Sequence, residues 1–326
     1  MKILIRATNW IGDAIMSLAA LRALRQRWPD AEIVVLAKPW VAALYEDERS
    51  VDRVIAMKDR WEAAWGLRRE GFDLAVVFPN SFESAAQVFL AGARRRVGYA
   101  RDGRSLLLTT AVPVVRGGHE RYYYLELLRR AGLIDSVPEV SEIRFDGVEE
   151  ARERGRQLFR SRGIDVPVVG VSPGAAYGTA KRWLPERFAE TAALMAARLG
   201  GSVAIFGSAA ERGLCEQIAT VCRGENLAGA TSLREFIDMT AACALFLSND
   251  SGAMPIAAAS GVPSVTVFGP TDETGTGPSS SLARIVREPV ECAPCKLRVC
   301  PIDHRCMTRV GVEQVVREAS KLLRLQ

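Results

Sequence analysis

One carboxylate stands where a predicted strand ends and a helix begins. The apolar segment KILIRA (2–7) leads into Thr8-Asn9-Trp10-Ile11-Gly12-Asp13, and apolar residues at helical spacing follow from Ala14 to Trp28. Gly12 permits a tight turn, and Asp13 stands at the helix start, close to the carboxyl end of the strand. Such an aspartate either stabilises the helix end or removes a proton from a hydroxyl group as a general base. Asp13 alone does not decide between these roles.

A glycine-rich loop with two adjacent cations follows the first predicted strand of the second half. It reads Ser172-Pro173-Gly174-Ala175-Ala176-Tyr177-Gly178-Thr179-Ala180-Lys181-Arg182-Trp183. The small residues let the backbone approach a ligand, and Lys181 and Arg182 bring positive charge to it. Cations beside such a loop can neutralise a departing diphosphate without a metal. A plain solvated loop is the structural alternative.

A third polar stretch lies between 247 and 278, where another buried strand ends. Asn249, Asp250 and Ser251 can cap the small-residue helix that begins near Gly252 and contains Met254, and the next strand ends at Gly269-Pro270-Thr271. Capping would leave the first N–H groups of this helix facing an anion. The carboxyl ends of strands are where α/β sheets hold ligands, so the stretch predicts a phosphate or sugar-diphosphate site. Polar caps on a buried helix are the alternative.

The seven cysteines fall into two groups. Cys215, Cys222 and Cys243 lie in apolar helical context and are expected in the core. The other four form Cys292-x-x-Cys295-x4-Cys300-x5-Cys306, with His304 beside them. A C-x-x-C pair can begin a zinc site, but the later spacings match no standard finger or ribbon, so free thiols or an adventitious disulfide are favoured.

The elements that position these motifs alternate between strand and helix in both halves of the chain. This alternation predicts an α/β protein with two doubly wound, Rossmann-like domains facing a central cleft. The segment 134–165 breaks the rhythm, so we expect domains at 1–150 and 151–326, and the last helix is a candidate to pack back on the first domain. Neither half carries G-x-G-x-x-G or a P-loop, which disfavours the usual nicotinamide and P-loop classes.

Composition and charge narrow the class of protein further. The chain has 326 residues, 48% of them hydrophobic, no apolar run that approaches a membrane span and no signal-peptide pattern at its start, so a cytoplasmic location is expected. Its net charge of +5 is uneven. Between residues 91 and 134 there are nine arginines and three acidic residues. This cluster is either a solvated surface or a patch that binds phosphorylated lipid. No nucleic-acid motif accompanies them. The arginines are Arg94, Arg95, Arg96, Arg101, Arg104, Arg116, Arg121, Arg129 and Arg130.

The motifs together resemble glycosyltransferase family 9, the ADP-heptose:lipopolysaccharide heptosyltransferases, and most closely its heptosyltransferase II branch. The resemblance extends from Arg6 to Met307. It is carried by Arg6-x-x-Asn9-Trp10-Ile11-Gly12-Asp13, Ser172-Pro173-Gly174-Ala175, Ala180-Lys181-Arg182-Trp183, Asn249-Asp250-Ser251-Gly252, Phe268-Gly269-Pro270-Thr271 and the Cys-x-Pro-Cys tail.

The resemblance implies a GT-B fold whose N-terminal domain binds the acceptor and whose C-terminal domain binds ADP-L-glycero-β-D-manno-heptose. It implies inverting transfer without metal or cofactor, to a heptose of the phosphorylated lipopolysaccharide inner core, by an enzyme peripheral to the inner face of the cytoplasmic membrane. Asp13 would be the general base, and Lys181 would hold the diphosphate. Donor contacts are expected at Ser172, Gly174, Ala175, Lys181, Arg182, Asn249, Asp250, Ser251, Gly252 and Met254, and acceptor contacts at Asn9, Trp10, Gly12, Arg94 and Arg96.

One position departs from the family pattern. Where the family has His after Asn-Asp-Ser-Gly-x-Met, this chain has Pro255. Proline is sterically acceptable in the first turn of a helix, but an imidazole that could donate a hydrogen bond to phosphate or sugar is lost. Two alternatives therefore stay open. One is a GT-B-like transferase or epimerase for another nucleotide sugar, and the other is a catalytically impaired homologue that only binds a nucleotide sugar or metal.

Overall fold

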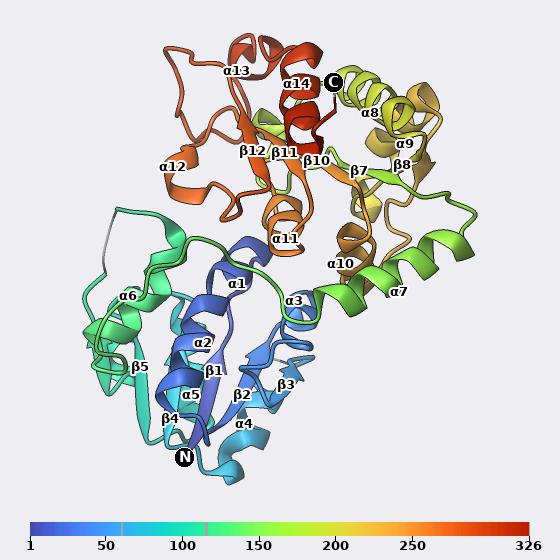
Figure 1. Ribbon diagram of the computed structural model, residues 1–326. Helices are drawn as coiled ribbons and strands as arrows, with labels where there is room; N and C mark the ends of the chain where they lie inside the picture. The colour runs from blue at the N-terminus through green and yellow to red at the C-terminus, as the bar shows by residue number, and fades with distance from the viewer. Residues whose placement is uncertain (60, 115–116, 326) are drawn as a thin grey trace. The chain divides into compact units, whose positions relative to one another are not determined.

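The chain folds into two compact units, Met1–Asp146 and Gly147–Gln326 (Figure 1). The computed structural model describes residues 1–59, 61–114 and 117–325. Each unit contains a six-stranded parallel sheet, which confirms the predicted α/β class. The predicted boundary after residue 150 lies inside helix α7 (Val148–Ser161), the first helix of the second unit. None of the described helices is long and apolar enough to cross a membrane.

The first unit has the strand order β3-β2-β1-β4-β5-β6. Its strands are β1 (Lys2–Arg6), β2 (Glu32–Ala37), β3 (Arg53–Ala56), β4 (Leu74–Val77), β5 (Arg95–Tyr99) and β6 (Thr110–Val112). Its helices are α1 (Ile11–Met16), α2 (Leu18–Arg27), α3 (Pro39–Ala42), α4 (Glu62–Gly66), α5 (Phe82–Leu90) and α6 (Tyr123–Arg130), with 3₁₀ turns η1 (Ala43–Tyr45), η2 (Leu67–Glu70), η3 (Arg104–Leu107) and η4 (Glu120–Tyr122).

Two local predictions for this unit need correction. The helix expected from Ala14 to Trp28 is interrupted at Ser17, whose hydroxyl donates to the Ala14 carbonyl over 2.7 Å and so competes with regular helix bonding. The apolar and β-branched residues from 106 to 115 predict an extended segment, but this segment begins in turn η3 and contains only the short strand β6. Val115 and Arg116 lie outside the described residues.

The second unit repeats the same order, β12-β11-β10-β7-β8-β9. Its strands are β7 (Val168–Ser172), β8 (Ser202–Ile205), β9 (Glu225–Asn226), β10 (Leu245–Asn249), β11 (Ser264–Val267) and β12 (Ala283–Val286). Its further helices are α8 (Pro185–Leu199), α9 (Arg212–Cys222), α10 (Leu233–Ala241), α11 (Ala253–Ala259), α12 (Glu273–Thr276), α13 (Arg305–Thr308) and α14 (Val312–Leu323), with 3₁₀ turns η5 (Thr179–Lys181) and η6 (Ala209–Glu211).

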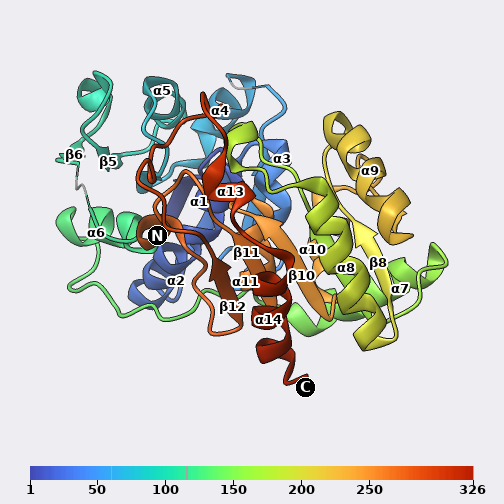
Figure 2. The ribbon, with the colours of Figure 1, turned by 90° about the horizontal axis from the view of Figure 1, so that it is seen from above.

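Alternate residues of the second sheet face two separate apolar cores. Val169 and Val171 pack with α8, α9 and α14, whereas Val168 and Phe246 pack with α7, α10 and α11 on the other face (Figure 1). The last helix, α14, lies beside α8 in both views and contacts β11 and β12 (Figure 2). The helix expected as a candidate to pack on the first domain thus buries its apolar face in the second unit.

The strand order reverses at the same place in both units. In the first unit the reversal lies between β1 and β4, and in the second between β7 and β10. Ligands of doubly wound sheets bind beyond the carboxyl ends of the strands at this point. The loop 7–10 follows β1 and the loop 173–182 follows β7, so the topology places both at such a position.

Candidate functional site

Asp13 is a half-buried residue of α1 whose carboxyl group has a raised pKa. Burial raises the pKa of Asp13 to about 6, and the negative charge of Glu120 adds to the rise. Helix α1 contacts η4, and this contact brings Glu120 close. No described residue donates a hydrogen bond to the Asp13 carboxylate or forms an ion pair with it. The group is therefore ionised at neutral pH and available to accept a proton.

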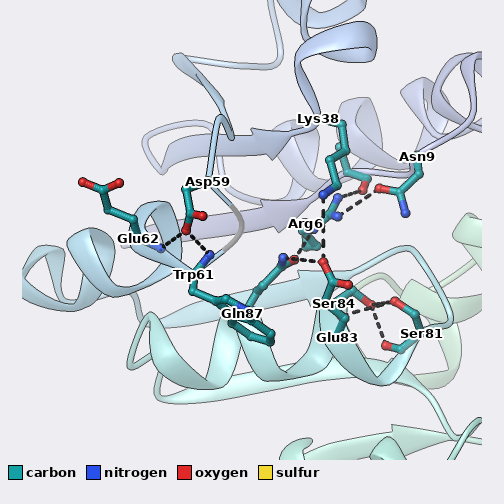
Figure 3. Close-up of polar contacts among 11 residues, drawn as sticks. Arg6, Asn9, Lys38, Asp59, Trp61, Glu62, Ser81, Glu83, Ser84 and Gln87 are labelled. Atoms are coloured by element: carbon teal, nitrogen blue, oxygen red, sulfur yellow. Dashed lines mark hydrogen bonds and ion pairs between the residues drawn. The ribbon is translucent and has the colours of Figure 1, made fainter.

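The turn before Asp13 is held by a buried arginine. Figure 3 shows the Arg6 side chain between Gln87 and Asn9: Nε donates to Gln87 Oε1 over 2.7 Å and Nη2 to Asn9 Oδ1 over 2.9 Å. Burial lowers the pKa of Arg6 to about 10. The indole Nε1 of Trp40 donates to the Asn9 carbonyl over 2.9 Å. Asn9 thus fixes the loop, whereas Trp10 beside it is exposed.

Arg94 and Arg96 lie at the other end of the first sheet. Arg96 pairs in register with Ala75, which itself pairs with Leu4, and Arg94 precedes the start of β5. Both therefore lie toward the amino ends of the strands, whereas Asp13 follows the carboxyl end of β1. The structure therefore does not bring them together with Asn9, Trp10 and Gly12. The prediction failed because the positions of charges along the chain do not tell which end of a strand they flank.

Lys181 and Asp250 form the centre of the second unit's site. Lys181 Nζ lies 2.6 Å from Asp250 Oδ2, and the Thr271 hydroxyl donates to the same oxygen. Both charged side chains are largely buried, so the pair is well fixed. An ammonium group has three donors, and this contact leaves two of them for a ligand. Loops after β7, β10 and β11 thus meet in one polar cluster.

Asn249 connects the same loops through its amide. Its Nδ2 donates to the Pro173 carbonyl over 2.7 Å, and its Oδ1 accepts from the backbone N–H of Trp183 over 2.9 Å. Trp183 is fully buried and donates through Nε1 to the Val310 carbonyl over 3.1 Å. The conformation of the glycine-rich loop therefore depends on Asn249 at one end and on Trp183 at the other.

The predicted helix cap at 249–251 is wrong. Helix α11 begins at Ala253 with Gly252 at its N-cap, and no side chain caps it, because the amide of Asn249 and the carboxylate of Asp250 are engaged elsewhere. The backbone N–H of Met254 donates to the Ser251 carbonyl over 3.2 Å. Pro255 occupies the third position of α11. The helix forms around it, as expected, because proline is sterically tolerated in the first turn of a helix.

Glu211 explains the small residue at 174 and the direction of Arg182. A Cβ atom on Gly174 would lie only 2.0 Å from Glu211 Oε1, so a larger residue there would displace the Glu211 carboxylate. The guanidinium Nη2 of Arg182 lies 3.8 Å from that oxygen. Arg182 is thus paired with a carboxylate beside the loop. Ser172 and Ala175 are buried and shape the loop.

The C-terminal segment 296–304 adds residues that the sequence analysis did not assign to the site. Tyr177 OH donates to the Lys296 carbonyl over 2.7 Å, and the Ala180 N–H donates to the Arg298 carbonyl over 3.0 Å. His304 Nε2 lies 2.8 Å from the Ala180 carbonyl. The ring of Tyr177 has Lys181 Nζ 5.0 Å from its centroid and the Arg298 guanidinium 5.2 Å from it. The segment 296–304 therefore supplies a second cation at the ring of Tyr177, in addition to Lys181.

The cysteines of this tail are free thiols in the structure. Cys292 and Cys295 are exposed, Cys300 is half-buried and Cys306 is buried, which raises the pKa of its thiol to about 11. Within the described ranges no three His, Cys, Asp or Glu side chains gather as a metal site would require.

Comparisons with known proteins agree with the family named from the motifs. Residues 60–305 match the model of glycosyltransferase family 9 (heptosyltransferase). Lipooligosaccharide heptosyltransferase 2 of Haemophilus ducreyi is 30% identical over 99% of both chains, and lipopolysaccharide heptosyltransferase 2 of Escherichia coli K12 is 32% identical over 88% of both. The solved structure of E. coli ADP-heptose lps heptosyltransferase II superposes with a TM-score of 0.83 and 30% identity, covering 99% of this chain and 98% of that one.

Proposed function

This chain belongs to glycosyltransferase family 9 and is a glycosyltransferase of GT-B fold, and we propose that it transfers heptose to lipopolysaccharide. The donor is ADP-L-glycero-β-D-manno-heptose, and the acceptor is a heptose of the phosphorylated inner core, reached at the inner face of the cytoplasmic membrane. The observation that carries this proposal is that each unit has a reactive charged group after a strand at which the strand order reverses. One unit offers the basic carboxylate Asp13, and the other offers the fixed ammonium of Lys181.

The chemistry that these groups support is a single displacement. Asp13 accepts the proton of the acceptor hydroxyl while that oxygen bonds to the anomeric carbon, and the bond from this carbon to the ADP oxygen breaks. Because the attack and the departure occur on opposite faces, the configuration inverts. Lys181 and Arg298 stabilise the negative charge that develops on the diphosphate, so no metal is needed. Asp250 keeps Lys181 in place.

The acceptor side of the proposal uses side chains at the carboxyl edge of the first sheet. Trp10 and Trp40 are exposed there, and aromatic rings suit the apolar face of a sugar. Lys38 directly follows β2, and Arg101 comes two residues after the end of β5. These two cations take the place of Arg94 and Arg96 as the proposed contacts for phosphate on the inner core.

The decisive experiment measures ADP release from ADP-heptose with a heptose-bearing inner-core acceptor. We expect acceptor-dependent release by the natural chain. Release that does not exceed the control without acceptor would refute the proposal. The variant Pro255→His tests the alternative of a catalytically impaired homologue. If only this variant is active, the proline is the cause of the lost activity. Ranking ADP, UDP and GDP by the thermal shift that each produces tests the choice of nucleotide.

A further inference from the structure

We propose that the face of the first unit formed by α4, α5 and η3 docks on an anionic membrane surface. Three large apolar side chains are exposed on this face: Trp65 is 59% exposed, Phe89 47% and Leu106 92%. Exposed apolar side chains that are scattered singly need no explanation, but a contiguous set marks an interaction surface. We call these residues, with Arg68, Arg94 and Arg96, the α4–α5 patch.

Contacts between neighbouring elements connect the members of the patch. The Arg68 side chain covers Trp65 and also approaches Gly92, where an added Cβ would lie 3.4 Å from Arg68 Cγ. Gly92 comes two residues after the end of α5, which carries Phe89. Turn η3, which carries Leu106, packs against α5. The apolar side chains therefore belong to one surface.

Arginines are interleaved with these apolar groups. The Arg68 guanidinium lies 5.1 Å from the centroid of Trp65, and that of Arg96 lies 5.2 Å from the centroid of Phe89. Arg96 Nε also donates to the Leu107 carbonyl over 2.7 Å, which connects this pair to η3. The Arg94 side chain is 81% exposed, although Asp73 lies 3.6 Å away. The patch thus combines aromatic rings with positive charge.

The combination of aromatic rings and positive charge favours an anionic membrane as the binding partner. Tryptophan and phenylalanine settle at the level of lipid headgroups, and each arginine near an anionic leaflet adds attraction. A second copy of this chain would instead place like charges of the two patches against each other. The choice of a membrane rests on the proposed function, since a lipid-linked acceptor lies at such a surface. It also gives Arg94 and Arg96 a role at the end of the sheet away from Asp13.

Co-sedimentation with vesicles tests the proposal on the full chain. Vesicles of phosphatidylglycerol and phosphatidylethanolamine should bind the protein, and vesicles of phosphatidylcholine alone should bind it much less. The variants Trp65→Ser with Leu106→Ser, and Arg68→Glu with Arg96→Glu, should each lower binding by about tenfold or more. Matched controls are Val221→Ser, an exposed apolar residue of α9, and Arg160→Glu on α7, and both should bind as the natural chain does.

The failure of this proposal is distinguishable from failure of the proposed function. Turnover with a delipidated, water-soluble acceptor should be unchanged in the patch variants, because none of the substituted residues is among the donor or acceptor contacts of the proposed function. Natural binding to anionic vesicles by the patch variants would overturn the docking surface, whatever the turnover. A concentration-dependent dimer that the same substitutions abolish, without any vesicle binding, would assign the surface to self-association and also overturn it.

Discussion

The surroundings of Asp13 disfavour the ionised form of its carboxyl group. Burial and Glu120 raise its pKa to about 6 from an ordinary 3.8. A base of this strength is still ionised at neutral pH, and it holds a proton far more firmly than an exposed aspartate does. Burial is the larger cause of the raised pKa. Glu120 comes from a segment remote in sequence, so its smaller share depends on the contact between α1 and η4.

The pH dependence of transfer follows from this pKa. Asp13 must be deprotonated to act as a base, so we expect kcat/KM to fall as the pH drops through about 6, with a limiting slope of one. The control is Glu120→Gln, which removes one cause of the raised pKa and should move this limb toward lower pH. A limb that stays in place in the Glu120 variant would assign it to another group.

Asp13→Asn should abolish transfer and at the same time stabilise the fold. The folded-state pKa of about 6 lies above the ordinary 3.8, so the protonated group favours the fold, and this stabilisation is lost as the pH rises through 6. At pH 7.5 the neutral amide should therefore raise the free energy of unfolding by roughly 1–3 kcal/mol.

Thermal unfolding at two pH values checks this second effect. The gain in Tm should be present at pH 7.5 and largely absent near pH 4, where Asp13 is protonated in the fold. Asp30→Asn, at an exposed turn, should change neither Tm nor transfer. A lowered Tm for Asp13→Asn at pH 7.5 would show that the carboxylate has a structural role instead.

At the scale of elements, the C-terminal segment 296–304 and the loop 173–182 are bonded to each other. Three hydrogen bonds join them, and Gly178 marks their closest approach, since an added Cβ would lie 2.2 Å from the Arg298 carbonyl. The position of Lys181 is therefore set from two directions, by Asp250 on one side and by the tail on the other.

Two substitutions in the tail should weaken donor binding more than the chemical step. Arg298→Ala removes a cation from the side of Tyr177, and His304→Ala removes the contact to the Ala180 carbonyl. For each we expect KM for ADP-heptose and Kd for ADP to rise by roughly tenfold, with a smaller change in kcat. Arg309→Ala, an exposed arginine after α13, is the matched control and should leave both constants unchanged. Unchanged ADP affinity in both variants would remove the tail from the donor site.

The sequence predicts more of the elements than of the contacts between them. Apolar runs and helical spacing locate β1, β7 and α8. The motifs identify Asp13, Lys181 and Asp250 as candidate site residues, because strand ends and their polar residues are adjacent along the chain. Arg298 and His304 escape prediction because their partners lie more than a hundred residues away. The cap at 249–251 fails because Asn249 and Asp250 also have distant partners, Pro173, Lys181 and Trp183, which lie 66 to 76 positions away. Asn249 and Asp250 bond across the sheet in preference to their own helix.

At the scale of the whole molecule, two sheets of identical strand order carry different chemistry. Each unit presents its functional groups after the strands that flank the reversal of order, a carboxylate in the first and cations in the second. The scaffold therefore fixes where a ligand can bind, and the loops decide which ligand it is.

Hydrogen exchange with ADP should separate the two units. Because the proposed diphosphate contacts lie only in the second, ADP should slow exchange at residues 176–182 and 296–304 and leave residues 8–16 unchanged. UDP at the same concentration is the control for a nucleotide-independent effect of anions. Protection confined to the first unit would contradict the assignment of the donor to the second.

Pro255 has one more consequence, and it concerns ionic strength. A proline at the third position of α11 provides no N–H, and α11 has only seven residues, so the backbone offers a diphosphate little at this helix end. The attraction must then come from side-chain cations, of which Arg298 lies in an exposed segment. Dissolved salt screens such charges over about 8–10 Å. Donor affinity should thus decline as salt is added, and a histidine at 255 should lessen that decline.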